Sequence, residues 1–137
     1  MIKKMVPLLL LCGFLSGCML GWRSGVNVLR LEPLGRGEVI AVVSRLNGVS
    51  VDSLPPKGLP QGGNWRRINV RRGNVVALVS FPTPEARKYF YDISIDTSSR
   101  SAEGKTFVKD LADALQKKFG DPSVVPQVER IVNDGGP

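Results

Sequence analysis

Cys18 carries the most distinctive reactive group in the sequence, a thiol at the end of an apolar run that opens behind Lys3 and Lys4. The three positions before it are Leu15, Ser16 and Gly17. A positive start, an apolar stretch and small residues before a cleavage point are the layout of an export signal. The run is too short to cross ~30 Å of hydrocarbon as a helix, since about 20 residues are needed. We therefore expect residues 1–17 to be a signal peptide.

The segment 15–18 resembles the lipobox of bacterial lipoproteins, whose invariant cysteine is lipidated. The resemblance implies that the Cys18 thiol receives a diacylglyceryl group, that the signal is cut before Cys18, and that the new N-terminus is usually acylated. It also implies the bacterial cell envelope as location and membrane lipid as a partner. Met19 in place of aspartate implies the outer membrane by the enterobacterial sorting rule. The alternative is an ordinary signal peptide with Cys18 as an incidental thiol.

The composition limits the fold and chemistry open to the chain after the signal. The chain has 137 residues, which suffices for one domain after cleavage. Cys12 lies inside the expected signal, so the mature chain would keep Cys18 alone and form no internal disulfide. The sequence contains no histidine, which removes the commonest general base and metal ligand. It also contains no GxSxG, HExxH, CxxC or phosphate-loop motif. We therefore expect no enzymatic activity, no cofactor and no bound metal.

Four arginines form the main basic cluster of a chain whose formal net charge is +7. They are Arg66, Arg67, Arg71 and Arg72. The planar guanidinium fork suits phosphate and carboxylate, so this cluster is a candidate site for an anionic lipid, an anionic glycan or an envelope protein. Nucleic acid is a poor candidate because a lipoprotein faces the envelope. The alternative is a solvated edge strand whose charges discourage aggregation.

A second constellation is the set of oxygen-bearing side chains at the first, third, fifth and twelfth positions of a calcium-loop register. They are Asp92, Ser94, Asp96 and Glu103. Thr97 stands where the sharp turn of such a loop requires glycine. The apolar residues in alternate positions from 89 to 96 favour a strand instead.

The elements that position these groups are clearest in the second half of the chain. Residues 65–71 alternate, so Arg67 and Arg71 are predicted to share one face of a strand with Asn69. Arg72-Gly73-Asn74 supplies a turn, and Val75 to Phe81 returns as an apolar strand. From Glu103 to Phe119 apolar residues recur at four-residue spacing, which predicts an amphipathic helix ended by Gly120.

The first half is less regular. Glu38 to Leu46 contains a continuous apolar run that predicts a central strand, and the Pro- and Gly-rich residues 51–64 predict an exposed loop. Thr83 is predicted to cap a brief helix, and residues 127–132 to add a short helical turn.

The segment 18–25 is predicted to be a lipidated tether. Trp22 in it suits the headgroup level of a membrane, and packing of Trp22 on the domain is the equal alternative. We expect a single domain over residues 26–132 and a polar tail over 133–137.

The fold class predicted is α+β: an antiparallel sheet of four to five strands packed against one main C-terminal amphipathic helix. The expected function is that of a membrane-anchored envelope lipoprotein acting as a non-enzymatic interaction or assembly module. The alternative is a carrier or inhibitor that binds an anionic lipid, glycan or protein through the arginine-rich hairpin.

Overall fold

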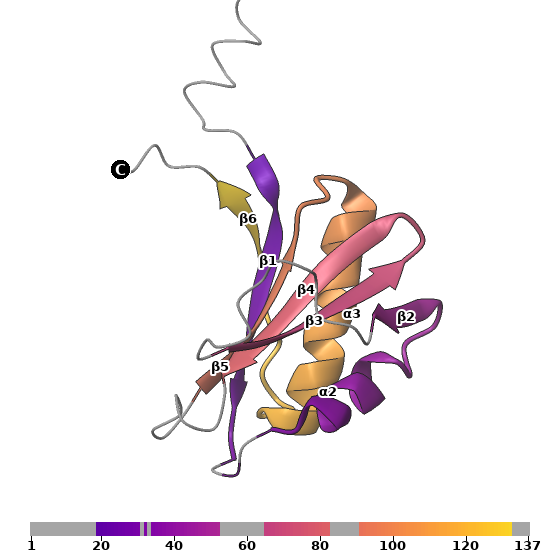
Figure 1. Ribbon diagram of the computed structural model, residues 1–137. Helices are drawn as coiled ribbons and strands as arrows, with labels where there is room; N and C mark the ends of the chain where they lie inside the picture. Colours follow the sequence, from indigo (N-terminus) through magenta and orange to yellow (C-terminus); the bar gives the residue numbers. More distant parts are fainter. Residues whose placement is uncertain (1–18, 31, 33, 53–64, 83–90, 133–137) are drawn as a thin grey trace, which may run out of the picture.

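The computed structural model describes residues 19–30, 32, 34–52, 65–82 and 91–132 (Figure 1). The fold is α+β, as predicted, with one antiparallel sheet and a C-terminal helix. The elements in chain order are β1 (Met19–Val28), α2 (Arg36–Val43), β2 (Val49–Asp52), β3 (Trp65–Arg72), β4 (Val75–Pro82), β5 (Tyr91–Thr97), α3 (Ala102–Phe119) and β6 (Val128–Val132). The predicted signal peptide, Cys18, the brief helix at Thr83 and the polar tail lie outside the described residues.

The sheet has six strands in the order β2-β3-β4-β5-β1-β6, and each neighbouring pair is antiparallel. The prediction of four to five strands was therefore too low. The two missed strands, β2 and β6, lie at the edges and are only four and five residues long. Short edge strands have little room for the alternation that reveals a longer strand, which is why they were missed.

The predicted tether over residues 18–25 is wrong for residues 19–25, which form the first part of β1 between β5 and β6. The inward positions here are filled by Trp22 and Ser24 instead of aliphatic side chains, so the strand pattern is weak. Ser24 is buried and its hydroxyl donates to the Gln127 carbonyl oxygen at 2.7 Å. That bond meets the rule that buried polar groups are paired.

The predicted hairpin is confirmed as β3 and β4, with Gly73 at a φ of +61° in the turn. A positive φ at the first central residue is what a type II′ turn requires. The strand predicted up to Asp96 is confirmed as β5, in which Ile93 and Ile95 are fully buried.

The amphipathic helix is confirmed as α3. The Ser101 hydroxyl accepts a hydrogen bond from the Gly104 N–H at 3.1 Å and so caps its start. Its buried stripe includes Phe107, Leu111 and Leu115, which pack into one core with the inward side chains of the sheet.

Residues 38–46 do not form the predicted central strand, because Arg36–Val43 is the helix α2. Val39 and Val43, four positions apart, are its buried residues. The Gly35 N–H donates to the Glu38 carboxylate at 2.9 Å, which caps the start of the helix. A short apolar run fits a buried helix as well as a buried strand, and the cap decides between them.

The predicted helical turn at residues 127–132 is also wrong, because Val128–Val132 is strand β6 and pairs with β1. Backbone pairing with an existing strand decides this short segment, whose own pattern is too brief to do so.

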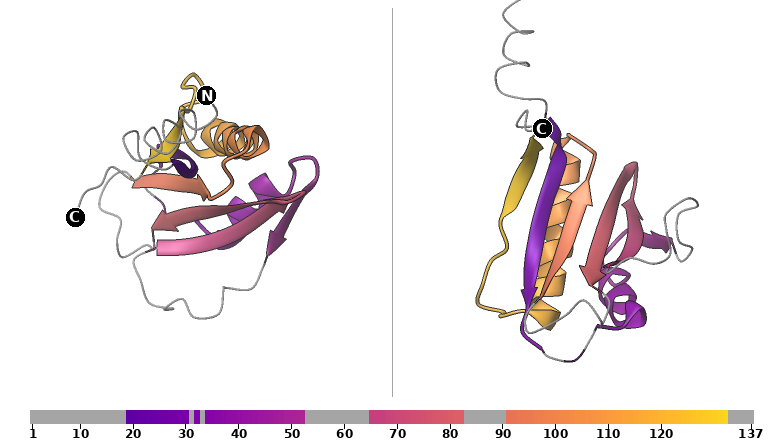
Figure 2. Two further views of the ribbon diagram at one scale, coloured as in Figure 1. Left: turned by 90° about the horizontal axis from the view of Figure 1, so that it is seen from above. Right: turned by 60° about the vertical axis from the view of Figure 1, so that its left-hand side comes forward.

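Both helices contact the sheet and each other on one side (Figure 2). One face of the sheet is thus covered by α2 and α3, and we call the opposite side the open face. Among the described residues, no helix has both the length and the apolar character that crossing a membrane requires.

Candidate functional site on the open face

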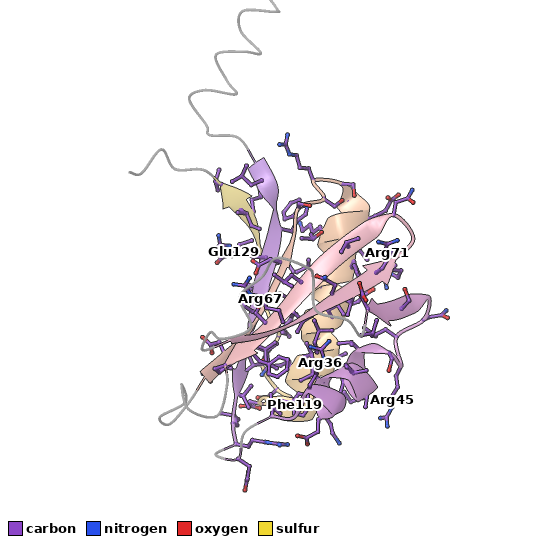
Figure 3. The ribbon with its side chains drawn as sticks, viewed as in Figure 1. Arg36, Arg45, Arg67, Arg71, Phe119 and Glu129 are labelled. Carbon is purple, nitrogen blue, oxygen red and sulfur yellow. The ribbon has the colours of Figure 1, made fainter. Side chains whose placement is uncertain are left out.

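The open face is formed by the side chains that alternate with the buried ones along each strand. In β3 these are Arg67, Asn69 and Arg71, whereas Ile68 and Val70 are buried against the helices. The sharing of one face by Arg67, Asn69 and Arg71 is as predicted. Figure 3 shows Arg67 near the middle of the sheet and Arg71 toward the β3–β4 turn.

Arg72 lies on the other side of β3, toward α3. Its Nη1 is 2.8 Å from Asp110 Oδ2, and its guanidinium carbon is 4.8 Å from the centroid of the Phe107 ring. The guanidinium therefore has an acidic partner and an aromatic surface within the domain. Its role here is to hold the hairpin to the helix.

The predicted four-arginine site is accordingly divided. Arg67 and Arg71 are exposed on the open face, Arg72 is engaged with α3, and the Arg66 side chain lies outside the described residues. Four residues of extended strand place Arg67 about 13 Å from Arg71. That separation suits an extended polyanion better than a single phosphate.

The alternative interpretation of β3 as a charged edge strand is wrong for residues 69–72. Residues Asn69 to Arg72 pair with β2, which is the edge strand on this side of the sheet. The charges of β3 therefore do not protect a free backbone edge over this stretch.

Arg23 lies between two carboxylates on the open face. It is directly opposite Asp96 of β5 on one side and Glu129 of β6 on the other. Opposite charges in such cross-strand positions contribute about 0.2–1 kcal/mol each. The Asp96 carboxylate also accepts a hydrogen bond from the Ser94 hydroxyl at 3.1 Å. This part of the face therefore has one cation between two carboxylates.

The residues of the calcium register do not converge. Asp92, Ser94 and Asp96 are in the extended strand β5, as the strand interpretation predicted, and Glu103 is in the first turn of α3. The part of the chain that the structure describes holds no group of three or more His, Cys, Asp or Glu side chains placed to bind a metal ion.

Trp22 packs on the domain. Its indole N–H donates to the Ser101 carbonyl oxygen at 3.1 Å, and the Lys105 ammonium is 5.0 Å from the centroid of its ring. Of the two interpretations of Trp22, the structure supports packing against the start of α3.

A shallow hollow of about 360 Å³ lies at the end of the sheet where β1 begins. Leu20 and Ile131 line one side of it, and Val76 and Leu78 of β4 line the other. It forms because β5 ends at Thr97 while β1 and β4 continue past that point (Figure 1). Polar atoms enter its lining from Asn69, Asp96 and Ser98.

A second hollow of about 500 Å³ lies between the β3–β4 turn and the first turns of α3. Arg72 and Glu103 bring opposite charges to its lining, and Phe107 lies at its base. Because the guanidinium is already bonded to Asp110, this hollow offers no free cation for an anionic ligand.

The sequence alone did not reveal the first hollow, because two of its five apolar lining residues belong to segments whose predicted structure is wrong. Leu20 lies in the predicted tether and Ile131 in the predicted helical turn. One available signal was β4, whose residues from Val75 to Leu78 are apolar at both inward and outward positions. A strand with only one covered face needs apolar residues at the inward positions alone.

Comparisons with family models, curated proteins and solved structures found no match to this chain.

Proposed function

We propose that this chain is a lipoprotein of the bacterial envelope, anchored through an acylated Cys18, whose small α+β domain acts as a non-enzymatic interaction or assembly module. The observation that carries the proposal is Leu15-Ser16-Gly17-Cys18 at the end of the short apolar run behind Lys3 and Lys4. Two or three acyl chains anchor a protein durably, whereas a single chain binds only marginally. The outer membrane is the proposed location because Met19 follows the lipidated position.

The start of β1 at Met19 is compatible with this arrangement. A folded domain that begins one residue after the anchor would sit close to the bilayer surface, since one residue spans at most ~3.6 Å. Recognition of a partner would then fall to surfaces that the helices do not cover, such as the open face.

Mass spectrometry of the full chain expressed in a bacterium tests the anchor. The mature protein should lack residues 1–17 and carry a diacylglyceryl group on Cys18. Cys18→Ser should remain uncleaved and unlipidated, whereas the matched variant Cys12→Ser should be processed as the wild type is. Equal behaviour of the two variants would show that Cys18 is not the anchoring residue.

In-cell crosslinking tests the interaction role. Partners captured by the lipidated protein should be lost or reduced with Cys18→Ser, because anchoring places the domain at the membrane. Turnover of a cell-wall or lipid substrate that one side-chain substitution abolishes would contradict the non-enzymatic proposal.

A second candidate function is a carrier or inhibitor that binds an extended anionic lipid assembly, glycan or protein. It is favoured by the exposure of Arg67 and Arg71 on one face. Replacing both by alanine should weaken binding to a polyanion and reduce its salt dependence, because surface charges are screened by salt. Arg45→Ala, an exposed change beyond the end of α2, is the matched control. Unchanged binding after the double substitution would remove this candidate.

A further inference from the structure

The start of β1 contains a β-bulge that places an apolar side chain on the surface. Met19 pairs with Val132 and Gly21 with Ile131, so Leu20 is an extra residue in β1. Gly21 has a φ of +137°, a conformation that L side chains rarely adopt. Bulges redirect side chains, and Leu20 lines the hollow and is 43% exposed. A surface leucine is thus built into the strand immediately after Cys18.

Other apolar side chains gather at the same place. We define the apolar corner as Leu20, Val76, Leu78, Ile131 and Val132. Leu20, Val76 and Val132 are 43%, 41% and 48% exposed, in that order. Leu20, Val76, Leu78 and Ile131 line the hollow. Val132 lies beside it at the end of β6, where it pairs with Met19. Single exposed apolar residues are ordinary, but a group around one hollow marks an interaction surface.

Cations border the apolar corner. Arg71 is directly opposite Val76 in the sheet and shares its face. Arg130 lies near the same end of the sheet but pairs with Trp22, so it points to the other side of β6 from Ile131. Arg100 lies two residues beyond Ser98, which lines the hollow. All three are exposed, and Figure 3 shows Arg71 near the β3–β4 turn. Asp96 also lines the hollow, and Asp96 and Glu129 lie opposite Arg23 from its two sides. Apolar side chains bordered by arginines match a bilayer interface with anionic headgroups.

We propose that the apolar corner rests in the interfacial layer of the bilayer that holds the Cys18 lipid, and so sets the orientation of the domain. The inference rests on the proposed function, because the anchor must precede Met19. The corner lies at the start of β1, and Leu20 is two residues from the anchor. In this orientation the opposite end of the sheet, with exposed Leu29, Val124 and Val125, points away from the membrane.

Membrane affinity is the wrong measurement for this contact. The acyl chains contribute about 0.8 kcal/mol for each buried methylene, so they dominate binding whether or not the corner touches lipid. Orientation is the quantity that the corner controls. A depth-sensitive reporter on each end of the domain measures it directly.

The chain is well suited to this measurement. Its two cysteines are Cys12, which the signal would carry away, and Cys18, which would be blocked by lipid. A cysteine introduced elsewhere is then a single labelling site for an environment-sensitive fluorophore. We would use Val76→Cys and Val132→Cys in the apolar corner, with Leu29→Cys and Val125→Cys as exposed controls at the opposite end.

The experiment uses the full chain, processed in a bacterium and reconstituted into phosphatidylethanolamine–phosphatidylglycerol vesicles that contain a nitroxide-labelled lipid. Fluorophores at positions 76 and 132 should be quenched at least about twofold more than those at positions 29 and 125. Equal quenching at the two ends would overturn the inference. Mass spectrometry of the same sample reports lipidation of Cys18, and a sample without lipid would overturn both this inference and the proposed anchor.

A second arm separates contact from mere closeness to the anchor. With the reporter at Val76→Cys, the added pair Leu20→Glu and Val132→Glu should remove most of the quenching while the protein stays in the vesicles. The matched pair Leu29→Glu and Val125→Glu should leave it unchanged, and thermal unfolding verifies that all variants fold. Retained quenching after the first pair would mean that the anchor alone holds this end near lipid, which overturns the inference.

Discussion

The two faces of the sheet follow different rules. On the face covered by α2 and α3, side chains such as Val26, Ile95 and Phe107 are fully buried in one core. On the open face the same strands present Arg23, Asn69, Asp96 and other polar groups. A shift of one residue in register would exchange these sets, so burial of one face determines the pairing of all strands. The open face is left to carry recognition.

The apolar corner is the place where this division fails. Alternation alone would turn Leu20 inward with Trp22 and Ser24, but the bulge at Gly21 turns it outward. Val76 and Leu78 are apolar at outward positions of β4. Departures from a pattern that the rest of the sheet obeys are where a functional contact is expected.

The largest effect expected from the comparison of faces concerns two neighbours in β5. Ile95→Ala should lower the free energy of unfolding by about 2–5 kcal/mol, since Ile95 is fully buried and its loss leaves a cavity. Asp96→Ala, one residue away on the open face, should lower it by about 1 kcal/mol or less, through the loss of its cross-strand pairing with Arg23. Urea unfolding of both variants measures the difference. Similar losses would mean that the open face is also a packed surface.

A smaller effect is expected at the bulge. A Cβ atom on Gly21 would lie 2.8 Å from the carbonyl carbon of Thr97, and the φ of Gly21 is +137°. Gly21→Ala should therefore cost about 1–3 kcal/mol of unfolding free energy. Gly37→Ala is the matched control, because a Cβ there meets nothing within 4 Å. Thermal unfolding compares the two, and an equally tolerated Gly21→Ala would contradict the bulge geometry.

The two faces of β3 supply a third comparison. Arg72→Met should cost about 1 kcal/mol, because it removes the ion pair with Asp110 and the contact of the guanidinium with Phe107. Arg71→Met, exposed on the open face, should change stability by less than about 0.5 kcal/mol. Urea unfolding again gives both values. A larger cost at Arg71 would indicate that this residue is structural and weaken its assignment to recognition.

The smallest effect concerns Glu38 at the start of α2. The hydrogen bond from Arg30 and that from the Gly35 N–H lower the pKa of the Glu38 carboxyl below its ordinary value. A carboxyl whose pKa is lower in the folded state than in the unfolded state stabilises the fold at pH values above its unfolded-state pKa. This stabilisation is lost as the pH falls through the folded-state pKa. The Glu38 side chain is 47% exposed, so screening by solvent limits its contribution to the free energy of unfolding to roughly a few tenths of a kcal/mol.

Glu38→Gln should therefore differ from the wild type at neutral pH and converge with it in acid. The measurement is the midpoint of thermal unfolding of both proteins from pH 7 down to pH 3. A difference that grows as the pH falls would have the wrong sign for this ion pair.

Long elements with a clear period were predictable from sequence. The four-residue spacing of Phe107, Leu111 and Leu115 located α3, and alternation about a Gly-containing turn located the β3–β4 hairpin. Short elements were not. Residues 39–43 are apolar throughout, and only the cap from Glu38 and the packing of Val39 and Val43 on the core decide for a helix.

The candidate site was predictable only in part. Alternation correctly grouped Arg67 and Arg71 on one face, but could not show that Arg72 turns to Asp110, 38 positions later in the chain. The apolar corner combines residues from β1, β4 and β6. No local pattern brings these segments together, because strand order is decided by long-range pairing.

The sequence by itself determined the lipobox resemblance, the α+β class, the central hairpin and the helix that covers the sheet. These depend on residue identity and on periodicity within one segment, which local chemistry is enough to express. Only the tertiary structure decided that residues 19–25 are a strand, that Arg72 serves packing while Arg71 faces solvent, and that Leu20 meets Val76 and Ile131 in one hollow. Those outcomes depend on pairing and burial between segments far apart in the chain. The interactions that stabilise them form only once the strands have paired in the sheet.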